Sequence, residues 1–273
     1  MSLLSIVVVS LNAGDRLEKT LHSIAKQSYR DYEVIIKDGG STDGSLQKAQ
    51  ESDAWTRLNQ VRLIVEKDRS IYDGMNQAVK NVAGKYVQFL NCGDYFSSEH
   101  VLRDVAEVIT HTEKEIQDKV PLIFYGDQYN QIQNCKISSV PEINDFALFR
   151  NVPCHQVCFY DASLFLKRAY KIEYSVRADY EHFLYCIYEE HAKAVHMDIV
   201  VCDYEGGGYS ETKENRLRSK EQHREITDRY LGLKAKKYRF IMIMTLSGLR
   251  TRLAESKRFS KIYNALKSCI YRH

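Results

Sequence analysis

Residues 4–15, LSIVVVSLNAGD, and residues 32–45, YEVIIKDGGSTDGS, contain the pattern that decides the predicted fold. In both segments an apolar, largely β-branched run ends at a turn rich in Asn, Gly, Asp and Ser, as a buried strand followed by a loop does. Between the two segments, Leu17, Leu21 and Ile24 recur at helical spacing. The pattern therefore predicts a strand, a helix and a second strand.

The same alternation continues along the first half of the chain. A third strand is predicted over residues 61–65, a helix over 72–79 and a fourth strand over 85–90. This order favours a mostly parallel α/β sheet with helices on both faces. The second half is less regular, and its apolar runs predict a helix over 179–188 and strands over 120–125, 131–137, 156–160 and 194–202.

Length and composition limit the class of protein. Of the 273 residues, 44% are apolar, which is enough for a core and excludes a disordered chain. We expect an α/β domain over residues 1–210 and a helical extension over 211–273. The longest apolar run of the extension, residues 240–246, is far shorter than the ~20 residues of a membrane helix. Seven cysteines without regular spacing predict free thiols in a reducing cytoplasm.

The charge is distributed unevenly. Residues 234–273 contain 11 Lys or Arg and one acidic residue, whereas the rest of the chain contains 28 basic and 35 acidic residues. A basic, apolar helical segment can lie on an anionic membrane surface, and we expect this at the inner face of the plasma membrane rather than contact with nucleic acid. The alternative is that its apolar side chains pack on the main domain or on a second copy of the chain.

Polar residues follow the predicted strands. No Walker phosphate loop is present and no GxGxxG follows the first strand, which removes the main signature of ATP-driven and dinucleotide-binding proteins. Ligands of open α/β sheets bind at the carboxyl ends of the strands, and the loops there contain Asn12, Asp38, Asp68 and Asp94. Asp38 can accept hydrogen bonds from a base or ribose; the alternative is a glycine-rich turn capped by Ser41 and Asp43.

The segment Asn91-Cys92-Gly93-Asp94 ends the fourth apolar run. A carboxylate at a sheet edge, beside an amide oxygen, suits Mg²⁺ or Mn²⁺ shared with substrate phosphates. Asp94 can equally be an Asx-turn residue.

In this order and spacing, the motifs resemble the inverting family 2 glycosyltransferases of the GT-A fold, over roughly residues 4–210. Residues 38–43, DGGSTD, resemble the DDGSTD motif of that family, with Lys37 in place of the first Asp of the motif. NCGD at 91–94 takes the place of the metal-binding DxD and retains only Asp94. Residues 5–12 resemble the first strand and nucleotide-facing turn of the family, and segments 70–76 and 83–86 are similar to a subgroup that makes bacterial cell-surface polysaccharides.

The resemblance implies roles for individual residues. Asp94 would bind the metal, and Asp179 would be the catalytic base, although it could merely cap the helix that follows. His155 would contact the donor phosphate or the acceptor, although a histidine of this kind is often a satisfied core residue. The late loop GGGYS, residues 206–210, could hold a diphosphate through its amides or be a plain turn. The implied nucleotide-sugar-binding residues are Ser10, Asn12, Asp38, Gly39, Asp68, Asn76, Asn91, His155 and Gln156.

The resemblance also implies an activity. The Gln-x-x-Arg-Trp motif of processive members is absent, and the single tryptophan is Trp55, which favours transfer of one sugar. We expect a metal-dependent, inverting hexosyltransferase that uses a nucleotide diphosphate sugar, UDP-linked by default, and a saccharide acceptor attached to a lipid. The alternatives are a catalytically silent nucleotide-sugar-binding or scaffold protein, suggested by Lys37 and the altered DxD, and a sugar nucleotidyltransferase, whose Gly-rich basic signature residues 11–16 do not supply.

Overall fold

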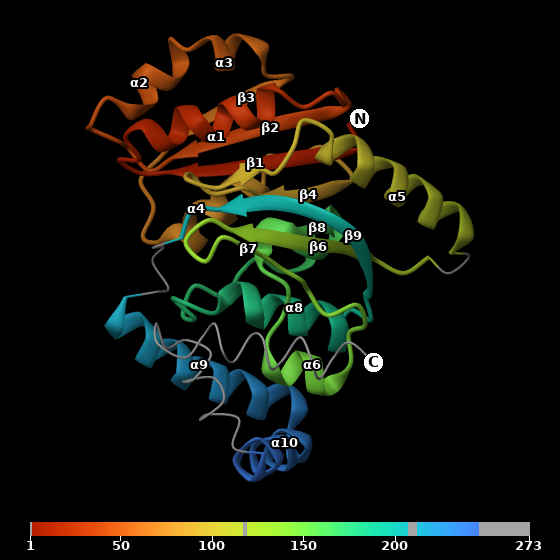
Figure 1. Cartoon of the computed structure of the whole chain (residues 1–273). Coiled ribbons are helices and arrows are strands. Elements are labelled where there is room, and N and C mark those ends of the chain that lie inside the picture. Colours follow the sequence, from red (N-terminus) through yellow and green to blue (C-terminus); the bar gives the residue numbers. More distant parts are fainter. Residues whose placement is uncertain (1, 117–118, 207–211, 246–273) are drawn as a thin grey trace. The chain divides into compact units, whose positions relative to one another are not determined.

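The structure, a computed structural model, describes residues 2–116, 119–206 and 212–245 (Figure 1). The chain divides into two compact units, residues 1–224 and 225–273, and each is considered by itself. The predicted domain boundary at residues 210 and 211 falls in the range 207–211, which lies outside the described residues, so that boundary stays a prediction.

The first unit is built on one curled sheet. The first four predicted strands are confirmed as β1 Leu4–Ser10, β2 Tyr32–Asp38, β3 Val61–Val65 and β4 Tyr86–Phe89. They pair in parallel, with Ser10 opposite Asp38 and Val7 opposite Phe89. Because the registers align the carboxyl ends of these strands, the loops that follow them lie along one edge of the sheet.

The second half of the sheet is mixed rather than mostly parallel. The strand order of the whole sheet, in the described chain, is β3-β2-β1-β4-β8-β6-β9-β5, with β7 beside β6. β8 runs antiparallel to both β4 and β6, whereas β6 and β9 are parallel. Apolar runs locate strands but contain no information on strand direction, which tertiary pairing decides. The bounds are β5 Tyr95–Phe96, β6 Leu122–Asn130, β7 Cys135–Ile137, β8 Cys158–Asp161 and β9 Lys193–Tyr204.

Helices flank this sheet. In Figure 1, α1, α2 and α3 lie beside β1–β3 at the top of the view, and α6 and α8 lie below β6 and β8. Leu17, Leu21 and Ile24 of α1 are fully buried, as their spacing predicts. The bounds are α1 Asp15–Ala25, α2 Ser45–Gln50, α3 Asp53–Arg57, α4 Ile71–Val79, α5 Val101–Glu115, α6 Asp145–Arg150, the 3₁₀ turn His155–Val157, α7 Ala162–Lys167 and α8 Ala178–Tyr188.

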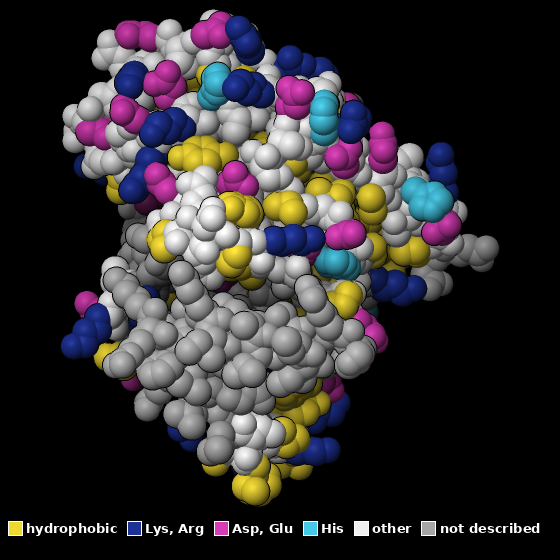
Figure 2. Space-filling view, viewed as in Figure 1, with side chains coloured by type: hydrophobic (Ala, Val, Ile, Leu, Met, Phe, Trp, Pro, Cys, Tyr) yellow, Lys and Arg dark blue, Asp and Glu magenta, His cyan; other side chains and the backbone are white. Residues whose placement is uncertain are grey.

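The C-terminal part is helical as far as it is described. α9 Lys213–Leu231 crosses the boundary between the units, and α10 Leu233–Met244 belongs to the second unit. The exposed apolar side chains of α10 are Leu233, Phe240, Ile243 and Met244. Figure 2 shows hydrophobic side chains gathered over α10 at the bottom of the view. Within the described ranges, no helix is both long enough and apolar enough to cross a membrane.

Candidate active site

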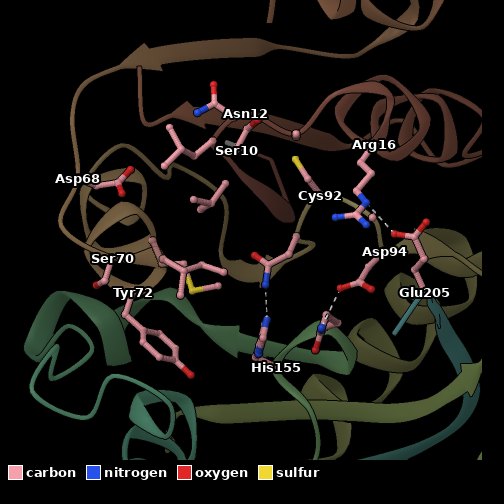
Figure 3. Close-up of a pocket in the computed structure, with 18 of the residues that line it drawn as sticks. Ser10, Asn12, Arg16, Asp68, Ser70, Tyr72, Cys92, Asp94, His155 and Glu205 are labelled. Atoms are coloured by element: carbon pink, nitrogen blue, oxygen red, sulfur yellow. Dashed lines mark hydrogen bonds and ion pairs between the residues drawn. The ribbon is translucent and has the colours of Figure 1, made fainter. Parts of the chain in front are cut away.

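A cavity of about 540 Å³ lies at the carboxyl ends of β1 and β4. Its size is that of a site for a nucleotide-sized ligand. Figure 3 shows Asn12 and Asp68 at one end, Arg16, Asp94 and Glu205 at the other, and Tyr72 and His155 along the lower edge. Seven of the predicted residues line it, namely Ser10, Asn12, Asp68, Asn91, Asp94, His155 and Gln156. Other polar or reactive lining residues include Arg16, Ser70, Tyr72, Cys92 and Glu205.

A buried ion pair forms the Asp68 end of the cavity. Lys37 is fully buried, and its ammonium donates to Asp68 Oδ2 at 2.7 Å, to the Glu66 carbonyl at 2.6 Å and to the Asp38 carbonyl at 3.2 Å. These three bonds use all the donors of a lysine. The carboxylate also lies against two glycines, since a Cβ would approach Asp68 Oδ2 to 2.8 Å on Gly39 and to 3.2 Å on Gly74. The Asp68 side chain is therefore held in one position.

Asp38 and Asn76 make supporting contacts and do not line the cavity. The buried Asp38 carboxylate accepts from the backbone N–H of Gly40 at 2.9 Å and of Ser41 at 2.7 Å. Asn76 donates to the carbonyl of Tyr170 and accepts from its N–H. Asp38 thus stabilises the glycine-rich turn, whereas Asn12 lines the cavity and accepts from Thr42 N at 2.9 Å. A donor-binding role for Asp38, Gly39 or Asn76 stays a prediction.

Asp94 provides a buried carboxylate at the opposite end. Its residue is 5% exposed, and Gln156 Nε2 donates to its Oδ2 at 2.8 Å. Burial raises the pKa of Asp94 to about 6, although the Gln156 hydrogen bond and nearby His155 act in the other direction. Within the described ranges, no group of three or more His, Cys, Asp or Glu side chains could bind a metal ion. Asp94 as a metal ligand therefore stays a prediction.

Arg16 and Glu205 lie beside Asp94 and were not predicted. Arg16 Nε is 3.0 Å from Glu205 Oε2, and both side chains line the cavity (Figure 3). Gly93 makes room for them, since it has φ 103° and a Cβ there would be 2.8 Å from Glu205 Oε2. The two residues are far apart in sequence and follow no motif, so the only available signal was their proximity to predicted loops.

A hydrogen-bonded chain joins the cavity to Asp179. Asn91 Nδ2 is 2.8 Å from His155 Nε2, and His155 Nδ1 is 3.1 Å from Asp179 Oδ2. With Asn91 donating, the neutral His155 tautomer with a proton on Nδ1 satisfies both contacts. Tyr72, also unpredicted, donates its hydroxyl to Asp179 Oδ1 at 3.0 Å. His155 is therefore a partner of Asp179 rather than an isolated core residue.

The environment of Asp179 favours the ionised carboxylate. Burial acts to raise its pKa, but the hydrogen bond from His155, together with the charge of Arg177, brings the pKa below its ordinary value. The Asp179 side chain remains 22% exposed, so part of it can be reached from outside. Arg177 occupies the N-cap position of α8, and the side chains that contact Asp179 come from α4 and the 3₁₀ turn.

Comparisons with known proteins agree with this geometry. A relative from Mycobacterium bovis, named "PGL/p-HBAD biosynthesis glycosyltransferase", is 32% identical over 212 residues, or 76% of this chain and 79% of the relative. A relative from Escherichia coli, named as a UDP-Glc:alpha-D-GlcNAc-diphosphoundecaprenol beta-1,3-glucosyltransferase, is 28% identical over 168 residues, covering 58% of this chain and 60% of the relative.

Solved structures share the GT-A fold. S. aureus TarS 1-349 in complex with UDP has a TM-score of 0.65 at 17% identity, over 94% of this chain and 73% of that one. A longer TarS chain is matched over 43% of its length. The mannosyltransferase PcManGT from Pyrobaculum calidifontis, in complex with GDP-Man and Mn²⁺, has a TM-score of 0.64 at 15% identity, over 99% of this chain and 81% of that one.

The family model described as Glycosyl transferase family 2 matches residues 5–170. This range contains the carboxyl-end loops of β1, β2 and β4 and the 3₁₀ turn with His155. With the curled α/β sheet and the cavity at its strand ends, the match confirms the predicted resemblance: the chain belongs to glycosyl transferase family 2.

Proposed function

We propose that this chain transfers one sugar, with inversion, from a UDP-sugar to a saccharide attached to a lipid, in cell-surface polysaccharide biosynthesis. The observation that carries the proposal is the hydrogen-bonded chain from Asn91 through His155 to Asp179, which links a nucleotide-sized cavity to a partly exposed carboxylate. The name of the E. coli relative supports both the UDP-linked donor and the lipid-linked acceptor.

Asp179 is the proposed catalytic base. Its Oδ1 receives hydrogen bonds from the Tyr72 hydroxyl and from Tyr180 N, whereas Oδ2 receives one from His155. Oδ2 therefore retains capacity to accept the proton of an acceptor hydroxyl. As that O–H bond breaks, the oxygen forms a bond to the anomeric carbon, and the bond from this carbon to the diphosphate breaks with its electron pair on the leaving group. Attack opposite the leaving group inverts the configuration.

Mg²⁺ or Mn²⁺ is the proposed cofactor at Asp94. The residues present fit such an ion only in part, because Asp94 provides one buried carboxylate whose Oδ2 already accepts from Gln156. Carboxylate oxygen is a suitable ligand for either ion, and phosphate oxygens and water commonly complete the shell. When bound, the ion would neutralise charge on the departing diphosphate. The Mn²⁺ in the PcManGT structure supports this choice.

The decisive experiment measures transfer and nucleotide release together. The full chain is incubated with UDP-sugars or GDP-mannose, Mg²⁺ or Mn²⁺, and lipid-linked saccharides, and product is detected by mass spectrometry. Asp179→Asn should retain UDP binding but lose about 10²- to 10⁴-fold in turnover, since an amide cannot accept the proton. Binding of UDP without release of nucleoside diphosphate under any combination would instead support the silent binding protein.

The basic C-terminal segment is proposed to bring the enzyme to its lipid-linked acceptor. In the described part of that segment, exposed Lys236 and Lys237 accompany exposed Phe240 and Ile243; residues 246–273 lie outside the described residues. Each Lys or Arg near an anionic surface contributes about 1 kcal/mol, screened by salt.

Co-sedimentation of the full chain with vesicles tests this docking. Binding to anionic but not neutral vesicles should weaken with salt and with the double substitution Lys236→Glu and Lys237→Glu. Equal sedimentation of wild type and variant would argue against docking, and a dimer in light scattering would favour packing against a second copy.

A further inference from the structure

The cations of the cavity wall differ in how they are held. Among the described residues that line it, the arginines are Arg16 and Arg69. Arg69 makes two side-chain contacts with Asp73, from Nε at 3.2 Å and from Nη2 at 3.4 Å. Arg16 contacts Glu205 through Nε alone, and its other guanidinium N–H groups have no hydrogen-bond partner in the described chain. A guanidinium has five N–H donors, so Arg16 is the less engaged of the two arginines.

The Arg16–Glu205 pair is also exposed. The two side chains are 61% and 36% exposed, and an ion pair in such surroundings contributes only about 0–1 kcal/mol. A guanidinium binds phosphate through two parallel hydrogen bonds, which are stronger than contacts to neutral groups. A diphosphate entering the cavity would thus compete effectively with Glu205 for Arg16.

Position favours the same ligand. Arg16 and Glu205 lie at the Asp94 end of the cavity, away from Asp68 (Figure 3). Gly93 lets the Glu205 side chain lie close to the 91–94 loop, which contains Asp94. The carboxyl group of Glu205 therefore holds the Arg16 guanidinium beside Asp94, where the phosphates of the donor are expected.

We propose that Arg16 binds the diphosphate of the donor, and that Glu205 holds Arg16 in place until the diphosphate replaces Glu205 as its partner. The inference rests on the proposed function, because it takes the ligand to be a nucleoside diphosphate. It assigns Arg16 to the phosphates and not to the base or ribose. Replacing Arg16 should therefore lower the affinity most for a ligand with two phosphates and not at all for a ligand with none.

Calorimetric titration with UDP, UMP and uridine tests this assignment in the full chain. Arg16→Gln should lower UDP affinity by about ten- to a hundredfold, the effect of losing charge-assisted hydrogen bonds. UMP affinity should fall less, and uridine affinity should not change. Arg16→Lys should restore part of the UDP affinity, and Glu205→Gln should leave it equal or higher, since the competing carboxylate is gone.

The matched control is Lys48→Gln. Lys48 is an exposed cation that pairs with Asp15 of α1 at 2.7 Å but does not line the cavity. Its loss removes the same charge and should leave all three affinities unchanged. The inference is overturned if Arg16→Gln leaves UDP affinity unchanged, or lowers uridine affinity equally. If wild-type protein binds none of the three ligands, the proposed function itself fails.

Discussion

Two ion pairs at opposite ends of the cavity have similar lengths and opposite surroundings. Lys37 Nζ is 2.7 Å from Asp68 Oδ2, with side chains 0% and 7% exposed. Arg16 Nε is 3.0 Å from Glu205 Oε2, with side chains 61% and 36% exposed. Distance alone would rate the pairs alike. Burial separates them, because a charge removed from water depends on its partner, whereas a solvated charge does not.

The difference gives the two ends different properties. The Lys37 ammonium has all its donors occupied, two of them by backbone carbonyls, so Asp68 is held rigidly before any ligand arrives. The exposed pair can exchange partners at little cost. One end of the cavity is therefore preorganised, and the other can adjust to an incoming anion.

The largest expected effect comes from breaking the buried pair. Lys37→Met leaves the Asp68 carboxylate without its cation and should lower the free energy of unfolding by about 3–5 kcal/mol. Arg16→Met, at the exposed pair, should change it by at most about 1 kcal/mol. Urea unfolding monitored by circular dichroism measures both. Equal losses in the two variants would contradict the distinction drawn from burial.

A buried ionisable group without a partner should behave differently again. His182 is fully buried, neither ring nitrogen has a hydrogen-bond partner among the described residues, and its ring stacks on Phe165 at 4.3 Å. Burial lowers the pKa of His182 to about 3, so this group remains neutral in the folded protein at neutral pH.

The sign of its pH effect follows. Between pH 6.5 and 3 the unfolded chain binds a proton at His182 that the folded protein does not, so stability falls as the pH falls. At pH 5, His182 should lower the free energy of unfolding by about 2 kcal/mol relative to neutral pH. His182→Phe should remove that part of the acid dependence. An unchanged dependence of the unfolding free energy on pH would argue against a neutral, buried His182.

A smaller effect should reveal how firmly Asp68 is held. Gly39→Ala places a methyl group 2.8 Å from Asp68 Oδ2, and such overpacking typically costs about 1–3 kcal/mol. In a Lys37→Met background the carboxylate is free to move, so the same substitution should cost less. A double-mutant cycle measures the coupling. Additive losses would mean that Lys37 does not hold the carboxylate.

The smallest expected effect concerns salt. Glu205→Gln should alter the free energy of unfolding by less than about 1 kcal/mol at low ionic strength, and by even less in 1 M salt, where exposed charges are screened over about 3 Å. Thermal unfolding at both ionic strengths measures this. A loss that persists in high salt would show that the pair has a structural role despite its exposure.

Much of the site could be predicted because it follows directly from strand ends. Ser10 and Asn12 follow β1, and Asn91 and Asp94 follow β4. In a parallel sheet such loops necessarily meet at one edge, so local patterns were enough to place these residues together. The glycine-rich turn was recognised equally well; the Asp38 carboxylate accepts from the backbone of that turn, and its donor-binding role stays a prediction. A pattern alone cannot distinguish an aspartate that accepts from a ligand from one that accepts from its own backbone.

Local sequence patterns were enough to predict the α/β alternation, the loops that line the cavity and the membership in a glycosyltransferase family. Tertiary structure alone decided the antiparallel placement of β8, the contacts of Tyr72 and His155 with Asp179, and the pairing of Arg16 with Glu205. The physical reason is range. Periodicity and turn chemistry act between residues a few positions apart, whereas burial and charge pairing depend on segments that only folding brings together.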